Sequence, residues 1–172
     1  MDFFIAAVKG TSRVCGVIAV LLVCSAVLVV CQMVVLRYFL HASTVWQTEY
    51  VTFSLVAATF IGGPYVALMK GHVNVDLLPL HVGPGARLGL ALVASAAALL
   101  FSLIACVTGF QLWLEAVEGG WRTETVWALP LWIPYLPMPV GFGLLALQYV
   151  VDILCLLRGD EMPFGLQPED RP

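Results

Sequence analysis

The chain has 172 residues, of which 61% are hydrophobic and 11% charged, and its mean hydropathy is +0.97. Soluble globular domains contain about 45–50% apolar and about 25% charged residues, so this chain has too few polar side chains to cover a water-facing surface. Eight Lys and Arg against eleven Asp and Glu also exclude the basic face of a nucleic-acid-binding protein. The composition indicates an integral membrane protein with almost no chain left for a separate catalytic domain.

Four apolar stretches are each long enough to cross a hydrocarbon core of roughly 30 Å. They cover about residues 14–36, 45–69, 88–114 and 132–157. The first is too long for the apolar part of a signal peptide, so we expect it to remain as an anchor. The residues before it, 1–13, have the composition of a short interfacial helix. We therefore expect an all-α membrane protein in which residues 1–172 form a single membrane domain with four spans.

Positive charge predicts the orientation, because cytoplasmic loops of membrane proteins are enriched in Lys and Arg. Six basic residues fall on the side of the two termini and the second loop: Lys9, Arg13, Lys70, Arg87, Arg158 and Arg171. Only Arg37 and Arg122 fall on the other side. Both termini are therefore expected in the cytoplasm. Most of the aromatic side chains near span ends then lie on the outer side, as an interfacial belt or as a docking surface: Trp46, Trp113, Trp121, Trp127, Trp132 and Tyr135.

Residues suited to catalysis or ion transport are scarce. No Asp, Glu, Lys or Arg falls near the middle of a span, where a coupled transporter needs an ionisable group. The five cysteines lack Cys-x-x-Cys spacing and the three histidines lie in loops, which argues against a redox, metal or haem site. A membrane enzyme with a metal site on the outer side is a competing hypothesis, and its ligands would come from His41, Glu49, Glu115, Glu118 and Glu124.

Several helix faces are instead suited to close packing. Small residues recur at spacings of four and three along the third span, which lets another helix approach closely: Ala91, Ser95, Ala98, Ser102, Ala105 and Gly109. The second span carries a similar face, formed by Thr48, Thr52, Leu55, Thr59 and Gly62. On the fourth span, Gly141, Gln148 and Asp152 share one side. These faces fit either a four-helix bundle packed on itself or contact with a larger partner, and the sequence leaves both open.

The order of several short motifs resembles a known family. Arg37-Tyr38-Phe39 ends the first span, and Trp46-x-x-Glu49 begins the second. Gly62 follows, and then the run Lys70-Gly71-His72-Val73-x-Val75-Asp76, an expected interfacial segment between the second and third spans. Together they resemble the DctQ-type small membrane subunits of tripartite ATP-independent periplasmic (TRAP) transporters. Many members have two acidic residues where this chain has Thr48-Glu49.

The resemblance implies a complex in the bacterial inner membrane. A large multi-span subunit would hold the substrate and sodium sites, and a periplasmic binding protein would deliver an organic acid. The small subunit would brace the large one, with no catalytic or substrate-binding residue and no cofactor of its own. Its candidate partner-contact or structural residues are Arg37, Trp46, Glu49, Gly62, His72, Asp76, Ser95, Ala98, Ser102, Gln148 and Asp152. The alternative is an independent small transporter or channel that forms a homo-oligomer, which would need a polar midplane lining.

Overall fold

The computed structural model describes residues 2–41, 43–69 and 84–158, and these fold into helices joined by short loops. The helices are α1 (Asp2–Phe39), α2 (Val45–Leu68), α4 (Pro84–Glu118), α5 (Trp132–Tyr135) and α6 (Pro137–Arg158). Four candidate membrane spans result, the last of them formed by α5 and α6 together. The predicted all-α fold with four spans is confirmed. The interfacial segment predicted around His72 and Asp76 lies outside the described residues.

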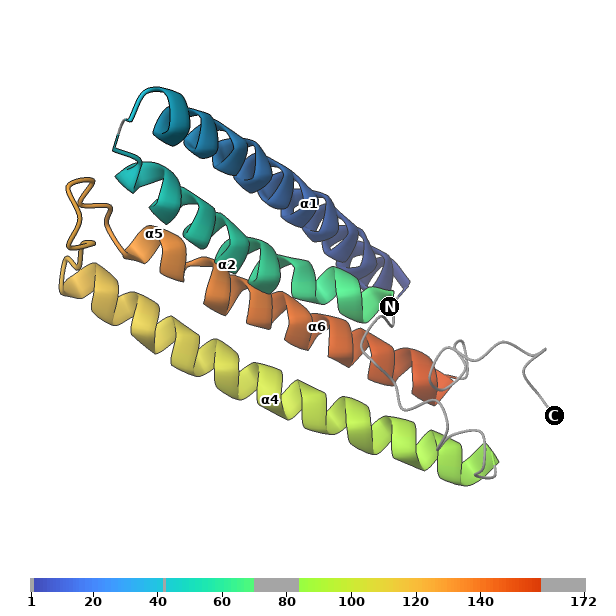
Figure 1. Cartoon of the computed structure of the whole chain (residues 1–172). Coiled ribbons are helices and arrows are strands. Elements are labelled where there is room, and N and C mark those ends of the chain that lie inside the picture. The colour runs from blue at the N-terminus through green and yellow to red at the C-terminus, as the bar shows by residue number, and fades with distance from the viewer. Residues whose placement is uncertain (1, 42, 70–83, 159–172) are drawn as a thin grey trace.

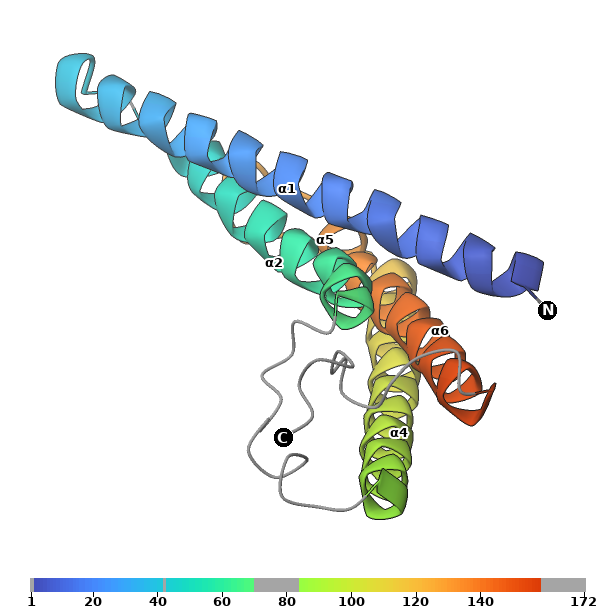
Figure 2. The same cartoon turned by 90° about the vertical axis from the view of Figure 1, so that its right-hand side faces the viewer.

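The four long helices form an open row in the order α1, α2, α6, α4 (Figure 1). The main interfaces join α1 to α2, α2 to α6, and α6 to α4, with a smaller contact between α1 and α6. The edge helices α1 and α4 share no substantial interface, and they are strongly inclined to one another (Figure 2). The arrangement is therefore a row rather than a closed four-helix bundle. Burial follows this order. In the most apolar 18-residue stretch of each span, 33% of the residues are buried in the last span but only 11% in α4.

Helix α1 is longer than the first predicted span. Its 38 residues extend about 57 Å at 1.5 Å per residue, against a bilayer thickness of about 40–45 Å with headgroups. Residues 2–13 continue the spanning helix, so the expected separate interfacial helix is wrong for the described residues. The extension stays helical because no proline interrupts it and because Ser12 is fixed to α6 by a buried hydrogen bond.

The start of α2 and α6 and the end of α1 and α4 lie together, and we call this the loop end. The opposite end, where Asp2 and Arg158 lie, is called the termini end (Figure 1). The charge distribution of the sequence predicts that the loop end faces the outside, and this orientation stays a prediction.

A close backbone approach joins α2 to α6 at Phe60 and Gly141. A Cβ at Gly141 would lie 2.6 Å from the carbonyl carbon of Phe60 and closer still to its oxygen. That carbonyl receives no helical amide hydrogen bond, because the residue four positions later is Pro64, which has no N–H. Glycine at position 141 thus lets the backbone of α6 approach a carbonyl of α2 that lacks its usual amide donor four residues later.

Candidate functional site

At the loop end, the segment 119–131 between α4 and α5 is attached to the start of α2. The Thr123 hydroxyl donates a hydrogen bond to Glu49 Oε2 at 3.3 Å and accepts one from the Leu129 amide at 3.0 Å. The Trp46 and Trp127 rings meet edge to face with their centroids 6.4 Å apart. The structure therefore brings the Trp46-x-x-Glu49 motif against this loop of the same chain. Oε1 of Glu49 is buried and has no hydrogen-bond partner among the described residues.

The loop itself has a defined backbone path. The Thr123 amide donates to the Leu129 carbonyl at 3.0 Å, and the Leu131 amide donates to the Trp121 carbonyl at 2.9 Å. Between these pairs, Ala128 has a φ of 48°, an unusual backbone conformation for a residue with a Cβ. The turn carries Val126 at its tip, where the side chain is 97% exposed. The loop thus exposes an apolar side chain next in sequence to Trp127, the residue that contacts Trp46.

Arg37 and His41 lie on the α1 side of the loop end, and both are exposed. Arg37 lies in the last turn of α1 and forms no ion pair with any residue that the structure describes. His41 has a φ of 49° in the turn between α1 and α2. The guanidinium of Arg37 is therefore available to a group beyond the residues that the structure describes.

At the termini end, a buried polar chain joins α1 to α6. The Ser12 hydroxyl donates to Oε1 of Gln148 at 2.9 Å, and Nε2 of Gln148 donates to Oδ1 of Asp152 at 3.0 Å. Gln148 is fully buried and Ser12 is 2% exposed. Polar groups in a membrane need such partners, and these three residues satisfy one another across the helix interface. The sequence predicted the face with Gln148 and Asp152, but it gave no signal for Ser12.

The small-residue face of α4 lies against α6. Ser102 is 1% exposed and its hydroxyl donates to the Ala98 carbonyl at 2.8 Å, while Ser95 and Ala98 are half-buried. Gly109 faces Met138, whose Cγ would lie 3.1 Å from a Cβ at that position. Within the described structure, Ser102 and Gly109 of this face pack inside the chain, and the predicted partner contact of Ser95 and Ala98 stays a prediction.

The threonine face of α2, in contrast, is exposed. Thr48, Thr52 and Thr59 each donate their hydroxyl to the carbonyl four residues earlier, so their polar groups are satisfied within the helix. Gly62, at the edge of this face, is turned toward Ala19 of α1, whose Cβ would lie 3.2 Å from an added Cβ. The face can meet lipid or another helix without leaving a hydroxyl unpaired.

The proposed metal ligands on the outer side do not converge. Among the residues that the structure describes, no group of three or more His, Cys, Asp or Glu side chains lies close enough to hold a metal ion. His41, Glu115, Glu118 and Glu124 are exposed, and Glu49 is engaged by Thr123. The structure therefore gives no support to the membrane-enzyme hypothesis within this part of the chain.

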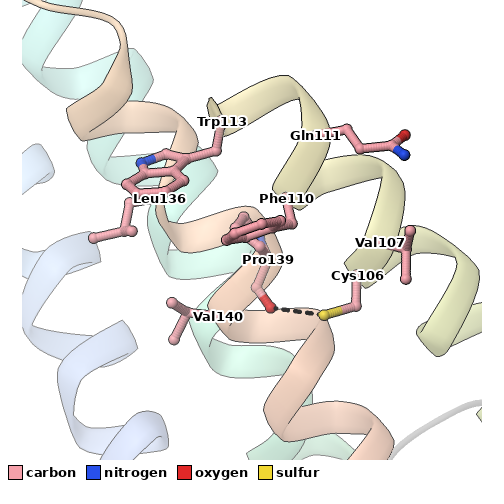
Figure 3. Close-up of a pocket in the computed structure, with 8 residues that line it drawn as sticks. All are labelled: Cys106, Val107, Phe110, Gln111, Trp113, Leu136, Pro139 and Val140. Atoms are coloured by element: carbon pink, nitrogen blue, oxygen red, sulfur yellow. Dashed lines mark hydrogen bonds between the residues drawn. The ribbon is translucent and has the colours of Figure 1, made fainter. Parts of the chain in front are cut away.

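A groove lies between α4 and α6 near the loop end (Figure 3). It has a volume of about 520 Å³ and is lined mainly by apolar side chains, among them Val107, Phe110, Leu136 and Val140. Cys106 closes one side by donating its thiol to the Pro139 carbonyl at 3.4 Å. The indole of Trp113 lies across the other end, with its N–H donated to the Trp132 carbonyl at 3.1 Å.

These features define a multi-span membrane protein whose polar side chains mainly join its own helices and loops. Residues 26–159 match the family model of the DctQ component of tripartite ATP-independent periplasmic transporters, and the chain belongs to this family. It is similar to the C4-dicarboxylate TRAP transporter small permease protein DctQ of Vibrio cholerae serotype O1. The two are 25% identical over 161 residues, which cover 80% of this chain and 69% of the relative. No solved structure matches the chain.

Family membership identifies the chain as a small permease subunit of a TRAP transporter and as a multi-pass protein of the bacterial inner membrane. The family is a transporter component, and its members associate in general with a large membrane subunit and a binding protein. The resemblance that Arg37, Trp46, Glu49 and Gly62 suggested is thereby confirmed at the level of the family. The individual roles predicted for these residues stay predictions.

Proposed function

We propose that this chain braces the large membrane subunit of its transporter during sodium-coupled uptake of an organic acid. A periplasmic binding protein delivers the acid, the large subunit holds the substrate and sodium sites, and this chain binds neither. The C4-dicarboxylate in the name of the Vibrio cholerae relative supports a carboxylate as the transported compound.

The observation that carries this proposal is the absence of charged residues from the middle of the spans, since Glu49 lies near the start of the second span and Asp152 near the end of the fourth. Ion-coupled carriers place ionisable groups inside the membrane. This chain has no Asp, Glu, Lys or Arg in residues 14–36, 50–69, 88–114 and 132–151. A chain of this kind can support a transport site in a neighbouring subunit, but it has little with which to couple transport to ions by itself.

The open row supports a bracing role. The two edge helices are covered on one side only. In their most apolar 18-residue stretches, 17% of the residues of α1 and 11% of those of α4 are buried. Helices with such exposed faces pack against lipid or against another membrane subunit. At the loop end, the exposed Arg37 offers a charged contact that the described part of the chain does not use.

The test is co-purification from the native membrane in mild detergent, combined with uptake of a labelled dicarboxylate under a sodium or a potassium gradient. We expect a multi-span partner in stoichiometric amount and uptake that requires sodium and this chain. Arg37→Glu should reduce both the recovered partner and uptake, whereas Arg37→Lys, which keeps the charge, should retain them. Recovery of this chain alone, as a homo-oligomer that transports in liposomes, would overturn the proposal.

Glu49→Lys is a second charge reversal at the loop end, with a different expectation. It removes the acceptor of the Thr123 hydroxyl and so should loosen loop 119–131 as well as any partner contact. A loss of assembly in Arg37→Glu with an intact loop therefore carries more weight than a loss in Glu49→Lys.

A further inference from the structure

A second hollow lies next to the groove between α4 and α6, at the loop end. This hollow has a volume of about 390 Å³ and is lined by Trp113, Val117, Gly120, Arg122, Pro130 and Trp132. The two spaces share Trp113, whose ring is fixed by its hydrogen bond to the Trp132 carbonyl. The Trp113 indole therefore borders both an apolar groove and a hollow that is lined in part by Arg122.

The charge of Arg122 is not neutralised within the described chain. Its side chain is exposed, and no carboxylate of the described residues lies within ion-pair distance of it. Its backbone is fixed, because Arg122 and Pro130 form the isolated bridge that closes the loop. An arginine held at the membrane–water boundary favours a phosphate, which its planar guanidinium can bind with two hydrogen bonds.

We propose that this composite site binds one phospholipid of the leaflet at the loop end. One acyl chain lies in the groove against Phe110 and Val140, and the phosphate binds Arg122 beyond the ring of Trp113. The groove has the size of a small-molecule site, which is roughly 300–1,000 Å³. Its position agrees with this occupant, because the groove lies within the spanning parts of α4 and α6. Trp113 lies in the last turns of α4 and Trp132 begins the last span, and indole rings near span ends favour the headgroup region.

The three carboxylates of the same region make a zwitterionic headgroup the better fit. Glu115, Glu118 and Glu124 are exposed at the end of α4 and in the loop that follows. They disfavour additional negative charge next to the phosphate, and they can attract an ammonium group. Phosphatidylethanolamine meets both conditions and is the probe for the test.

The experiment uses the full-length chain, together with any subunit that co-purifies, in nanodiscs containing phosphatidylethanolamine with a diazirine in one acyl chain. After irradiation, the labelled peptides are identified by mass spectrometry. We expect labels on residues 106–113 and 136–140. Unlabelled phosphatidylethanolamine should suppress this labelling, and diacylglycerol, which has no phosphate, should suppress it much less.

Two matched pairs of variants test the two halves of the site. Val140→Trp fills the groove and should abolish its labelling, whereas Val93→Trp, on a 68% exposed position of α4 outside the groove, should not. Arg122→Gln should weaken competition by phosphatidylethanolamine about tenfold, the loss expected for one charge-assisted hydrogen bond. Arg37→Gln, at the other exposed arginine of the loop end, should leave competition unchanged.

The proposal would be overturned if labelling of the groove persists in Val140→Trp. It would equally be overturned if phosphatidylethanolamine and diacylglycerol suppress the labelling to the same extent in the parent chain and in Arg122→Gln. A third result would also overturn it: in the assembled complex, the lipid does not label the groove, because a segment of the large subunit occupies it. Arg122 lies in an exposed loop, so its variant decides the question even if Val140→Trp does not fold.

Discussion

Replacement of Gly141 by alanine should separate helices α2 and α6. The added Cβ would lie 2.6 Å from the Phe60 carbonyl carbon, whereas carbon atoms in contact are about 3.5–4.0 Å apart. The helices must therefore move apart by about 1 Å, because a backbone carbonyl has no rotamer by which to move away. The movement also disturbs the Phe60–Phe142 ring contact, whose centroids are 5.4 Å apart. Overpacking of this kind costs about 1–3 kcal/mol of unfolding free energy.

Gly143→Ala is the matched control, since it lies on the same helix and gains the same methyl group. Its Cβ would be 3.5 Å from the Cys106 sulfur, an ordinary contact. Alanine also raises helix propensity by about 1 kcal/mol over glycine, but this gain is common to both variants and cancels in the comparison. Denaturant titration of the full-length chain in detergent, followed by circular dichroism, should place Gly141→Ala about 1–3 kcal/mol below Gly143→Ala. Equal midpoints, or a more stable Gly141→Ala, would refute the close approach of the two helices.

Three further predictions concern the polar contacts and the helix interface. A double-mutant cycle of Ser12→Ala and Gln148→Met, measured by unfolding in detergent, should give a coupling energy of about 0.6 kcal/mol, and at most about 1.7 kcal/mol. Additive effects of the two substitutions would contradict the buried hydrogen bond. Thr123→Val should speed proteolysis of loop 119–131 because it removes the hydrogen bonds to Glu49 and Leu129, and an unchanged cleavage rate would argue against that attachment. Ser102→Leu should destabilise the chain by about 1–3 kcal/mol, because the side chain is 1% exposed, whereas the exposed Thr108→Leu should be close to neutral.

The spans could be predicted from the sequence because membrane crossing depends on a local quantity, the length of an uninterrupted apolar run. For this reason α2 begins at Val45, as predicted, and α1 ends at Phe39, close to the predicted end at residue 36. The start of α1 does not, because residues 2–13 have a composition that suits both an interfacial helix and the extension of a spanning one. That choice depends on a tertiary contact, the hydrogen bond from Ser12 to Gln148.

The pairing of residues could be predicted much less well than their faces. Gln148 and Asp152 could be identified from the sequence as residues that form polar contacts, because amide and carboxylate groups inside a span need partners. A serine or threonine gives no such signal, since its hydroxyl can bond its own helix, as Thr48 and Ser102 do. The contact of Thr123 with Glu49 could not be predicted either, because 74 positions separate the two residues and no spacing rule applies across a loop. The open row was also not predictable, since a small-residue face does not specify which helix it meets.

The open row is stable because lipid, rather than water, surrounds the spans. In water, a row of four helices would expose apolar faces and close into a bundle, but lipid is as apolar as the side chains and imposes no such penalty. Exposed apolar surface in this chain therefore does not distinguish a partner interface from a lipid contact. Polar groups do distinguish them, because a buried or membrane-adjacent polar atom without a partner is costly. At the termini end, the hydrogen bonds of Ser12, Gln148 and Asp152 join one another. At the loop end, Oε1 of Glu49 and the guanidinium of Arg37 are not satisfied by the described residues, so contacts with the other subunits should be sought there first.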